Sequence, residues 1–152
     1  MRHKLIGLSL ALAILCTGPL AGCRESEPIR ATVRIGPTVA EFQVEVAQTA
    51  DQQRDGLSDR DELATGTGML FQFGSRSEQQ VWMAGMSMPL DIAWIADNKV
   101  VAIDTLTPCT DTDQNACPRW TSPSPVDSLL EVSAHSLATV IPGMAVDVEE
   151  LP

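Results

Sequence analysis

Apolar and polar residues alternate with a period of two in the stretch Val39–Ala47. Phe42, Val44 and Val46 are separated by acidic or amide side chains. This alternation is typical of a half-buried β-strand, because successive side chains of a strand point to opposite faces. The run Ala31–Gly36 is also strand-like, and the Gly-Pro-Thr sequence between the two runs predicts a turn, so we expect a hairpin.

Further strands are predicted along the rest of the chain. Leu90–Ala96 is apolar on both faces apart from one acid, which indicates a central strand. Lys99–Leu106 is its expected hairpin partner across an Asp-Asn turn. The other predicted extended segments are Gly68–Phe73, a short piece that begins Val81-Trp82-Met83, Ser128–Ala134, and a last strand in Met144–Leu151.

Turn and loop residues separate these strands. A short surface helix is predicted over Thr49–Leu57, with Thr49 as its N-terminal cap and Gly56 at its end. Gly74–Gln79 is predicted to be a turn, and the proline-rich Thr107–Val126 a long surface loop. Many short strands and one short helix predict a mainly β fold, a single compact antiparallel barrel or sandwich.

The N-terminus has the pattern of an exported protein. Basic residues precede an apolar run, Leu5–Leu15, which is shorter than the roughly 20 apolar residues that span a bilayer. This pattern indicates a secretory signal peptide. The sequence Leu20-Ala21-Gly22-Cys23 resembles a bacterial lipobox, which implies cleavage before Cys23 and acyl chains such as palmitate on it. We therefore expect a signal peptide over residues 1–22, a lipidated tether over 23–30 and a β domain over 31–152, lipid-anchored and extracytoplasmic on a bacterial membrane.

Two cysteines remain for the domain itself. Cys109 and Cys117 are predicted to form a disulfide, because exported chains meet an oxidising compartment. The alternatives are a metal pair and a redox pair, but the chain has neither suitable ligand spacing nor a CxxC sequence.

The charge of the chain restricts its partners. The net charge is −10, and removal of residues 1–22 leaves 8 basic and 20 acidic residues, a net charge of −12. Such acidity argues against binding to nucleic acid and against electrostatic attraction to anionic lipid. The expected partners are the membrane, through the lipid anchor, and an unidentified small molecule or protein.

The stretch Val81–Ile95 concentrates two tryptophans and three methionines around one acid, Asp91. A carboxylate in an apolar strand needs a partner. Arg54 and Arg60 are the natural candidates, and we expect an ion pair that pins the helix and its loop to the sheet. Trp94 shares the strand parity of the apolar residues and belongs to the core, so Trp82 is the better candidate for a ligand surface.

The methionines allow two interpretations. Met83, Met86 and Met88 have a spacing that resembles the motifs of exported copper carriers, and Met69 could add a fourth sulfur, since thioethers favour copper(I). Alternatively, the methionines fill irregular gaps in the core. We expect core packing, and therefore no cofactor and no resident metal.

Several motifs together resemble those of the DUF192 family, whose members have no assigned function. They are RDGLSDR (Arg54–Arg60), GMLFQF (Gly68–Phe73), the stretch Val81–Ile95, VVAI (Val100–Ile103), LLEV (Leu129–Val132) and Pro142-Gly143. The resemblance implies one compact β-rich domain, often exported or lipid-anchored, and no established reaction. The chain departs from the family pattern at Ser58, where Met is usual, and at Ala84-Gly85-Met86, where a Lys-Asn-Thr-like stretch is usual.

Three functions follow from these residues. The leading hypothesis is a small-ligand or partner-binding module that uses Trp82, Met83, Asp91 and Arg54 near one rim. The second is copper(I) handling through Met83, Met86 and Met88.

The third hypothesis is an enzyme acting on envelope material, with Asp91 as its acid and Glu131 and His135 as the only available helpers. The sequence has no nucleophile elbow, phosphate loop or HExxH zinc motif. We therefore favour a binding or accessory role and assign no catalytic residue.

Overall fold

The computed structural model describes residues 28–152. The predicted signal peptide, Cys23 and most of the tether lie outside the described residues. The elements follow in chain order as β1 (Arg30–Ile35), β2 (Ala40–Ala47), α1 (Ala50–Asp55), β3 (Thr67–Ser77), β4 (Gln80–Trp82), β5 (Leu90–Ala96), β6 (Lys99–Leu106), the 3-10 helix η1 (Gln114–Ala116), β7 (Arg119–Thr121), β8 (Val126–Ser133) and β9 (Val146–Glu150). Within the described part, no helix is long and apolar enough to cross a membrane.

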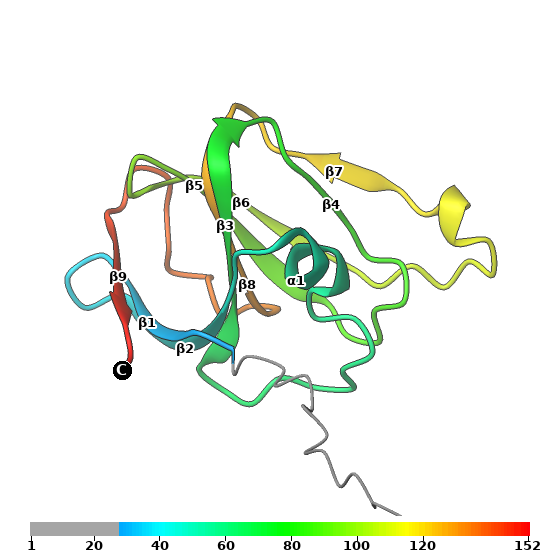
Figure 1. Cartoon of the computed structure of the whole chain (residues 1–152), viewed down its shortest axis with the longest axis horizontal. Helices are drawn as coiled ribbons and strands as arrows, with labels where there is room; N and C mark the ends of the chain where they lie inside the picture. The colour runs from blue at the N-terminus through cyan, green and yellow to red at the C-terminus, as the bar shows by residue number, and fades with distance from the viewer. Residues whose placement is uncertain (1–27) are drawn as a thin grey trace, which may run out of the picture.

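Seven strands form one curled sheet in the order β6-β5-β8-β3-β2-β1-β9, and β4 pairs with β7 in a second, small sheet (Figure 1). The starts of the two edge strands of the large sheet meet, because the N–H of Val100 donates to the carbonyl of Met144 at 2.9 Å and the N–H of Val146 donates to the carbonyl of Asn98 at 2.8 Å. The predicted mainly β, barrel-like fold is therefore confirmed.

One strand pair departs from the expected antiparallel arrangement. β2 and β3 are parallel, whereas every other named pair is antiparallel. A parallel pair requires a long crossover connection. The segment from Gln48 to Gly66, which contains α1, provides it.

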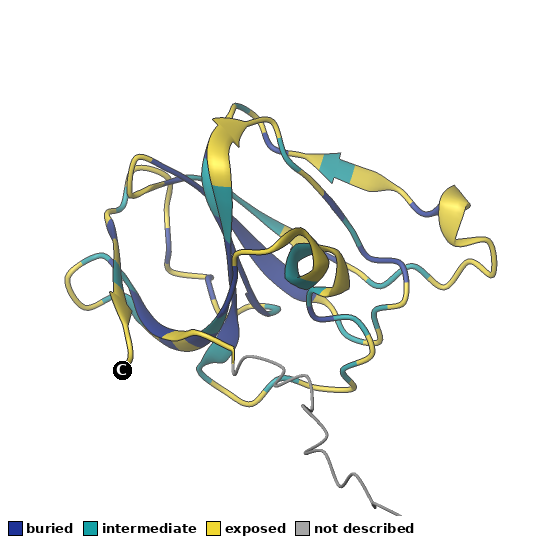
Figure 2. Ribbon diagram, in the orientation of Figure 1, coloured by how far each residue is buried: buried dark blue, intermediate teal, exposed yellow. Residues whose placement is uncertain are grey.

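The curled sheet has a hydrophobic cluster on each face. The inner cluster is enclosed by the strands of the large sheet and includes Val33, Ile35, Val44, Leu70, Ile95, Leu130 and Val132. The outer cluster lies between the other face of β3, β5 and β8 and the layer formed by α1, its following loop and β4; it includes Leu57, Met69, Phe71, Val81, Met83, Leu90, Ile92, Trp94 and Leu129. Both faces of the central strands are thus covered, and β5 is buried along its whole length (Figure 2).

Local sequence signals place α1 where it was predicted. The side chain of Thr49 accepts a hydrogen bond from the N–H of Gln52, and the side chain of Gln52 accepts one from the N–H of Thr49, which makes a capping box. Gly56 ends the helix with a φ of 51°. The helix has no fully buried residue, as its polar sequence predicted.

Two predicted non-strand segments contain strand structure. The expected turn Gly74–Gln79 is wrong, because β3 continues to Ser77 after a register shift that follows Gln72. The proline-rich loop contains β7, which pairs with β4 over the outer cluster. The predicted disulfide between Cys109 and Cys117 is confirmed.

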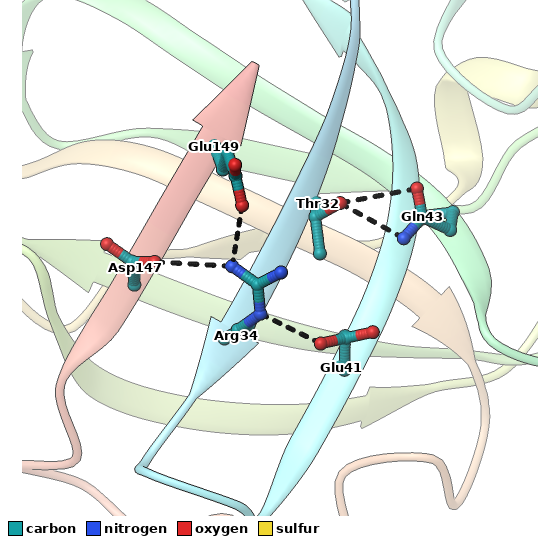
Figure 3. Close-up of polar contacts among 6 residues, drawn as sticks. All are labelled: Thr32, Arg34, Glu41, Gln43, Asp147 and Glu149. Atoms are coloured by element: carbon teal, nitrogen blue, oxygen red, sulfur yellow. Dashed lines mark hydrogen bonds and ion pairs between the residues drawn. The ribbon is translucent and has the colours of Figure 1, made fainter. Parts of the chain in front are cut away.

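The edge strand β9 is tied to β1 and β2 by a polar network on the solvent side of the sheet (Figure 3). Arg34 of β1 donates to Glu41 of β2 at 2.8 Å and to Glu149 of β9 at 2.9 Å, and it lies 3.6 Å from Asp147. These side chains are exposed, so water weakens each pair. These contacts show that the outward face of β1, β2 and β9 is exposed to solvent.

Candidate ligand-binding site

A cavity of about 240 Å³ lies beneath α1, between the outer face of the large sheet and β4. Its apolar lining residues come from the large sheet, from β4 and the loop after it, and from the loop after the helix: Leu57, Phe71, Phe73, Val81, Met83, Met86, Leu90 and Leu129. The lining also includes the aromatic ring of Trp82 and the polar side chains of Gln53, Arg54, Asp55, Ser58, Gln79, Gln80 and Arg119. One further acid, Glu131, belongs to the sheet itself.

Glu131 is the unusual residue of this cavity. It is only 6% exposed, and its strand neighbours in register are Met69 on β3 and Ile92 on β5. Burial in these apolar surroundings raises the pKa of its carboxyl to about 8, because the charged form is poorly solvated there. At neutral pH the cavity therefore contains a protonated carboxylic acid, which can donate as well as accept a hydrogen bond.

The Glu131 carboxyl has no protein partner among residues 28–152: no side-chain hydrogen bond or ion pair of the described part involves it, and burial alone accounts for the shift of its pKa. In the same part of the chain, no fully enclosed side-chain N or O atom lacks a hydrogen-bond partner. The carboxyl oxygens of Glu131 are therefore not fully enclosed, and the residue lines the cavity.

Gly68 sets the close approach of β3 and β8 beside Glu131. It lies opposite Val132, one position before the Met69–Glu131 pair. A Cβ atom at Gly68 would overlap the carbonyl oxygen of Glu131. Only glycine fits between the two strands here without a backbone shift.

The rim of the cavity has two arginines. Arg119 of β7 lies opposite Trp82 of β4, and its guanidinium carbon stands 4.0 Å from the centroid of the Trp82 ring. This is the geometry of a cation–π contact. Arg54 is exposed on α1 and pairs with Asp51 at 2.9 Å and with Asp55 at 3.4 Å.

The structure brings three of the four predicted ligand-binding residues together. Trp82, Met83 and Arg54 line the cavity, and Asp91 does not. The Oδ1 atom of Asp91 accepts a hydrogen bond from the hydroxyl of Thr105 at 2.7 Å, and its Oδ2 atom accepts one from the N–H of Leu137 at 2.9 Å.

The predicted ion pair of Asp91 with Arg54 or Arg60 is wrong. Arg60 instead makes a bidentate pair with Glu45, with two contacts of 2.8 Å, and this bond holds the pKa of Glu45 below its usual range. The physical reason is strand parity. Leu90, Ile92 and Trp94 face the outer cluster, so Asp91 faces the inner side, away from α1 and its loop.

The four methionines of the copper hypothesis lie on the outer side of the sheet. Met69 and Met83 are buried in the outer cluster, and Met86 and Met88 pack against it. Met83 and Met86 also line the cavity. This placement agrees with gap filling by flexible side chains. Among residues 28–152, no group of three His, Cys, Asp or Glu side chains could hold a metal ion.

Sequence reasoning considered Glu131 only as a helper for Asp91. A signal was nevertheless present, because Glu131 is the one charged residue in the apolar run Leu129–Val132 and shares the parity of Leu129. His135, the other expected helper, is exposed in the turn after β8, with a φ of 69°.

Comparisons with known proteins place this domain in a family. The sequence profile of DUF192, described as "Uncharacterized ACR", matches residues 31–148. The chain belongs to the DUF192 family. The match covers every strand except the first residue of β1 and the last two residues of β9.

Two solved structures share this fold. A Sinorhizobium meliloti protein, provisionally described as a transcription regulator, is 27% identical with a TM-score of 0.70, and the alignment covers 80% of this DUF192 chain and 95% of that chain. A Novosphingobium aromaticivorans protein of unknown function is 26% identical with a TM-score of 0.67, and the alignment covers 78% and 84% of the two chains. No curated protein matches the sequence.

Proposed function

We propose that this chain is an extracytoplasmic lipoprotein, anchored by acyl chains on Cys23, whose DUF192 domain binds a compact small molecule in the cavity beneath α1. The observation that carries the proposal is Glu131, a buried carboxyl that lines the cavity and has no partner within the described residues. Buried polar groups in folded proteins are nearly always paired. A ligand that hydrogen-bonds this acid would complete the site.

The shape and chemistry of the cavity support this role. Ligand sites combine apolar walls with a few placed polar groups, and their volumes start at roughly 300 Å³. At about 240 Å³ the cavity is smaller than this, which restricts it to a ligand of modest size. Gln53, Ser58, Gln79 and Gln80 are among its lining residues and have hydrogen-bonding side chains.

The alternatives have less support. The transcription-regulator description of the Sinorhizobium protein would imply DNA binding, but a net charge of −12 for residues 23–152 opposes the approach of DNA. Copper(I) handling rests on the spacing of Met83, Met86 and Met88. Titration of copper(I) into a triple Met-to-Leu variant tests it, and equal affinity of the variant and the wild type would remove that hypothesis.

The second candidate function is an enzyme that acts on envelope material, with Glu131 in place of Asp91 as its acid. A general acid works best when its pKa lies near the operating pH. Glu131, with its pKa of about 8 and its access to the cavity, meets this requirement. Asp91 does not reach the cavity, so Asp91→Asn would leave turnover intact and Glu131→Gln would abolish it.

The binding test uses the fragment Arg24–Pro152, which contains every described element, both hydrophobic clusters and the disulfide. Three small aromatic probes with neutral, cationic and anionic heads are titrated: benzyl alcohol, benzylamine and benzoate. We expect amide NMR shifts at Leu57, Val81 and Leu129 with at least one probe. Ser58→Trp should fill the cavity and abolish these shifts, whereas Ser136→Trp, in an exposed turn, should retain them. Absence of shifts with all three probes would contradict the proposal.

The anchor has its own test. Labelled palmitate supplied to a bacterial host should be incorporated into the full chain and not into a Cys23→Ser variant. Absence of label from the wild-type chain would remove the membrane part of the proposal.

A further inference from the structure

We propose that the cavity selects a small organic cation, a primary ammonium on a compact apolar body, which pairs with the Glu131 carboxylate and displaces the proton of the free acid. This inference rests on the proposed function and names the ligand class of the same site. The proton leaves to solvent, so the bound state is an ammonium–carboxylate pair.

The first argument is that apolar side chains surround Glu131. In register it lies opposite Met69 on β3 and Ile92 on β5, and Leu90, Val81 and Met83 line the same cavity. The charged residues of the lining are Arg54 and Asp55 on α1 and Arg119 on β7.

Both of these arginines are already engaged at the exposed rim. Asp51 and Asp55 hold Arg54, and Arg119 stacks over Trp82. Within the described residues, Glu131 has no cationic partner. An isolated buried carboxylate is costly and stays protonated, whereas a carboxylate that meets a cation can ionise.

The second argument is the aromatic and sulfur content of the walls. Phe71, Phe73 and Trp82 line the cavity together with Met83 and Met86. Aromatic faces attract cations, and thioethers are polarisable. The guanidinium of Arg119 stands 4.0 Å from the Trp82 ring centroid, which shows that an aromatic face at this rim accepts a cation.

The third argument is the field of the whole domain. Residues 23–152 have 20 acidic and 8 basic side chains, and a surplus of negative charge raises the local concentration of cations. The same field disfavours an anionic ligand. A neutral ligand could hydrogen-bond protonated Glu131, but it would gain nothing from this charge.

The coupling to protons gives the inference a specific signature. Below pH 8, Glu131 of the free protein is protonated, so binding of an ammonium releases about one proton. The affinity for benzylamine should therefore rise by nearly tenfold per pH unit well below the pKa, and by roughly 25-fold from pH 6 to pH 7.5. The affinity for benzyl alcohol, which displaces no proton, should stay constant.

The experiment is calorimetric titration of the Arg24–Pro152 fragment with benzylamine and benzyl alcohol at pH 6 and pH 7.5, in two buffers of different ionisation enthalpy. We expect benzylamine to bind at least tenfold more tightly than benzyl alcohol at pH 7.5, with release of about one proton when the free acid is protonated. Glu131→Gln should lose this preference and the pH dependence but keep the binding of benzyl alcohol. The matched control Glu150→Gln removes the same charge from an exposed edge strand and should behave like the wild type.

Any one of three results would overturn the assignment of the ligand class. These are equal affinities of the wild type for the two probes, binding of benzylamine without proton release, and unchanged benzylamine binding by Glu131→Gln. In those cases the binding function itself would stand if the amide shifts at Leu57, Val81 and Leu129 persist in the wild type and are lost in Ser58→Trp. Failure of benzyl alcohol, benzylamine and benzoate alike would overturn both the ligand class and the proposed function.

Discussion

Asp91 and Glu131 lie on neighbouring strands of one sheet, and their side chains lie on opposite faces. In the pairing of β5 with β8, Asp91 is opposite Val132, and Ile92 is opposite Glu131. On the inner side, Asp91 accepts two hydrogen bonds from Thr105 and Leu137. On the outer side, Glu131 has no described partner and lines the cavity. The first acid therefore has an architectural role, and the second is available for a ligand.

Asp91→Ala should lower the free energy of unfolding by about 2–3 kcal/mol, because the N–H of Leu137 loses its buried acceptor. Urea unfolding measures the loss. Hydrogen exchange should quicken at Leu137 and its neighbours before other parts of the inner cluster. Asp147→Ala, on an exposed side chain, is the control and should change stability by less than about 0.5 kcal/mol. A similarly small effect of Asp91→Ala would disprove its architectural role.

Glu131 should make the domain less stable as pH rises from about 4.5 to about 8. Between these values the unfolded chain has lost the Glu131 proton and the native chain still holds it, so the unfolded state binds fewer protons and the free energy of unfolding falls. The slope approaches about 1.4 kcal/mol per pH unit. Above pH 8 this contribution is constant.

Urea unfolding of wild type and Glu131→Gln across this pH range isolates the effect, because Gln does not titrate. We expect the stability of the variant relative to the wild type to increase with pH. Glu45 does not interfere, since its pKa is lowered by the Arg60 hydrogen bond and its contribution is lost only as pH falls below the usual range of a glutamate. Parallel pH profiles of the two proteins would refute the assigned pKa of Glu131.

Gly68→Ala should destabilise the domain by at least about 2 kcal/mol, because the added Cβ forces β3 away from the backbone of β8 at Glu131. Gly74→Ala is a matched control further along β3, where the added carbon meets no atom within 4 Å. Thermal unfolding of both variants gives the comparison. Equal melting temperatures of the two variants would show that β3 and β8 accommodate a Cβ atom at Gly68 without strain.

Replacement of both Cys109 and Cys117 by Ala should cost about 2.5 kcal/mol, the loop-closure entropy of a short bridged loop. The loss should also loosen the β4–β7 pair, because the N–H of Cys109 donates to the carbonyl of Met83 at 3.1 Å and β7 follows Cys117 closely. Urea unfolding and Trp fluorescence report the two effects. A reductant should cause the same two effects in the wild type and should not change the variant. Equal stability of the oxidised and reduced wild type would show that the disulfide does not stabilise the domain.

The sequence pattern predicted most of the strands because their signal is local. The alternation in Val39–Ala47 and the apolar run Leu90–Ala96 identify β2 and β5 without any knowledge of their partners. The parallel pairing of β2 with β3 and the short strand β7 were missed, since each depends on contacts distant in sequence. A strand of three residues in a proline-rich segment carries no periodic signal of its own.

The candidate site was predicted in part for the same reason. Trp82 and Met83 are unusual by composition and do line the cavity. Asp91 was assigned to an arginine because its two partners have no sequence signature: the hydroxyl of Thr105 lies 14 residues and the backbone of Leu137 lies 46 residues further along the chain. The importance of Glu131 follows from its burial and the cavity above it, and neither is visible in a single strand.

The most direct test of the account is the titration of the Glu131 side chain itself, followed by the carboxyl ¹³C shift in the Arg24–Pro152 fragment, with Glu131→Gln to assign the signal. We expect a midpoint near pH 8, well above the 4.5 of an ordinary glutamate, because the carboxyl is buried and has no partner among residues 28–152. Addition of benzylamine should move this midpoint downward. A midpoint near 4.5 in the free protein would mean that Glu131 is charged at neutral pH, and it would contradict the central claim.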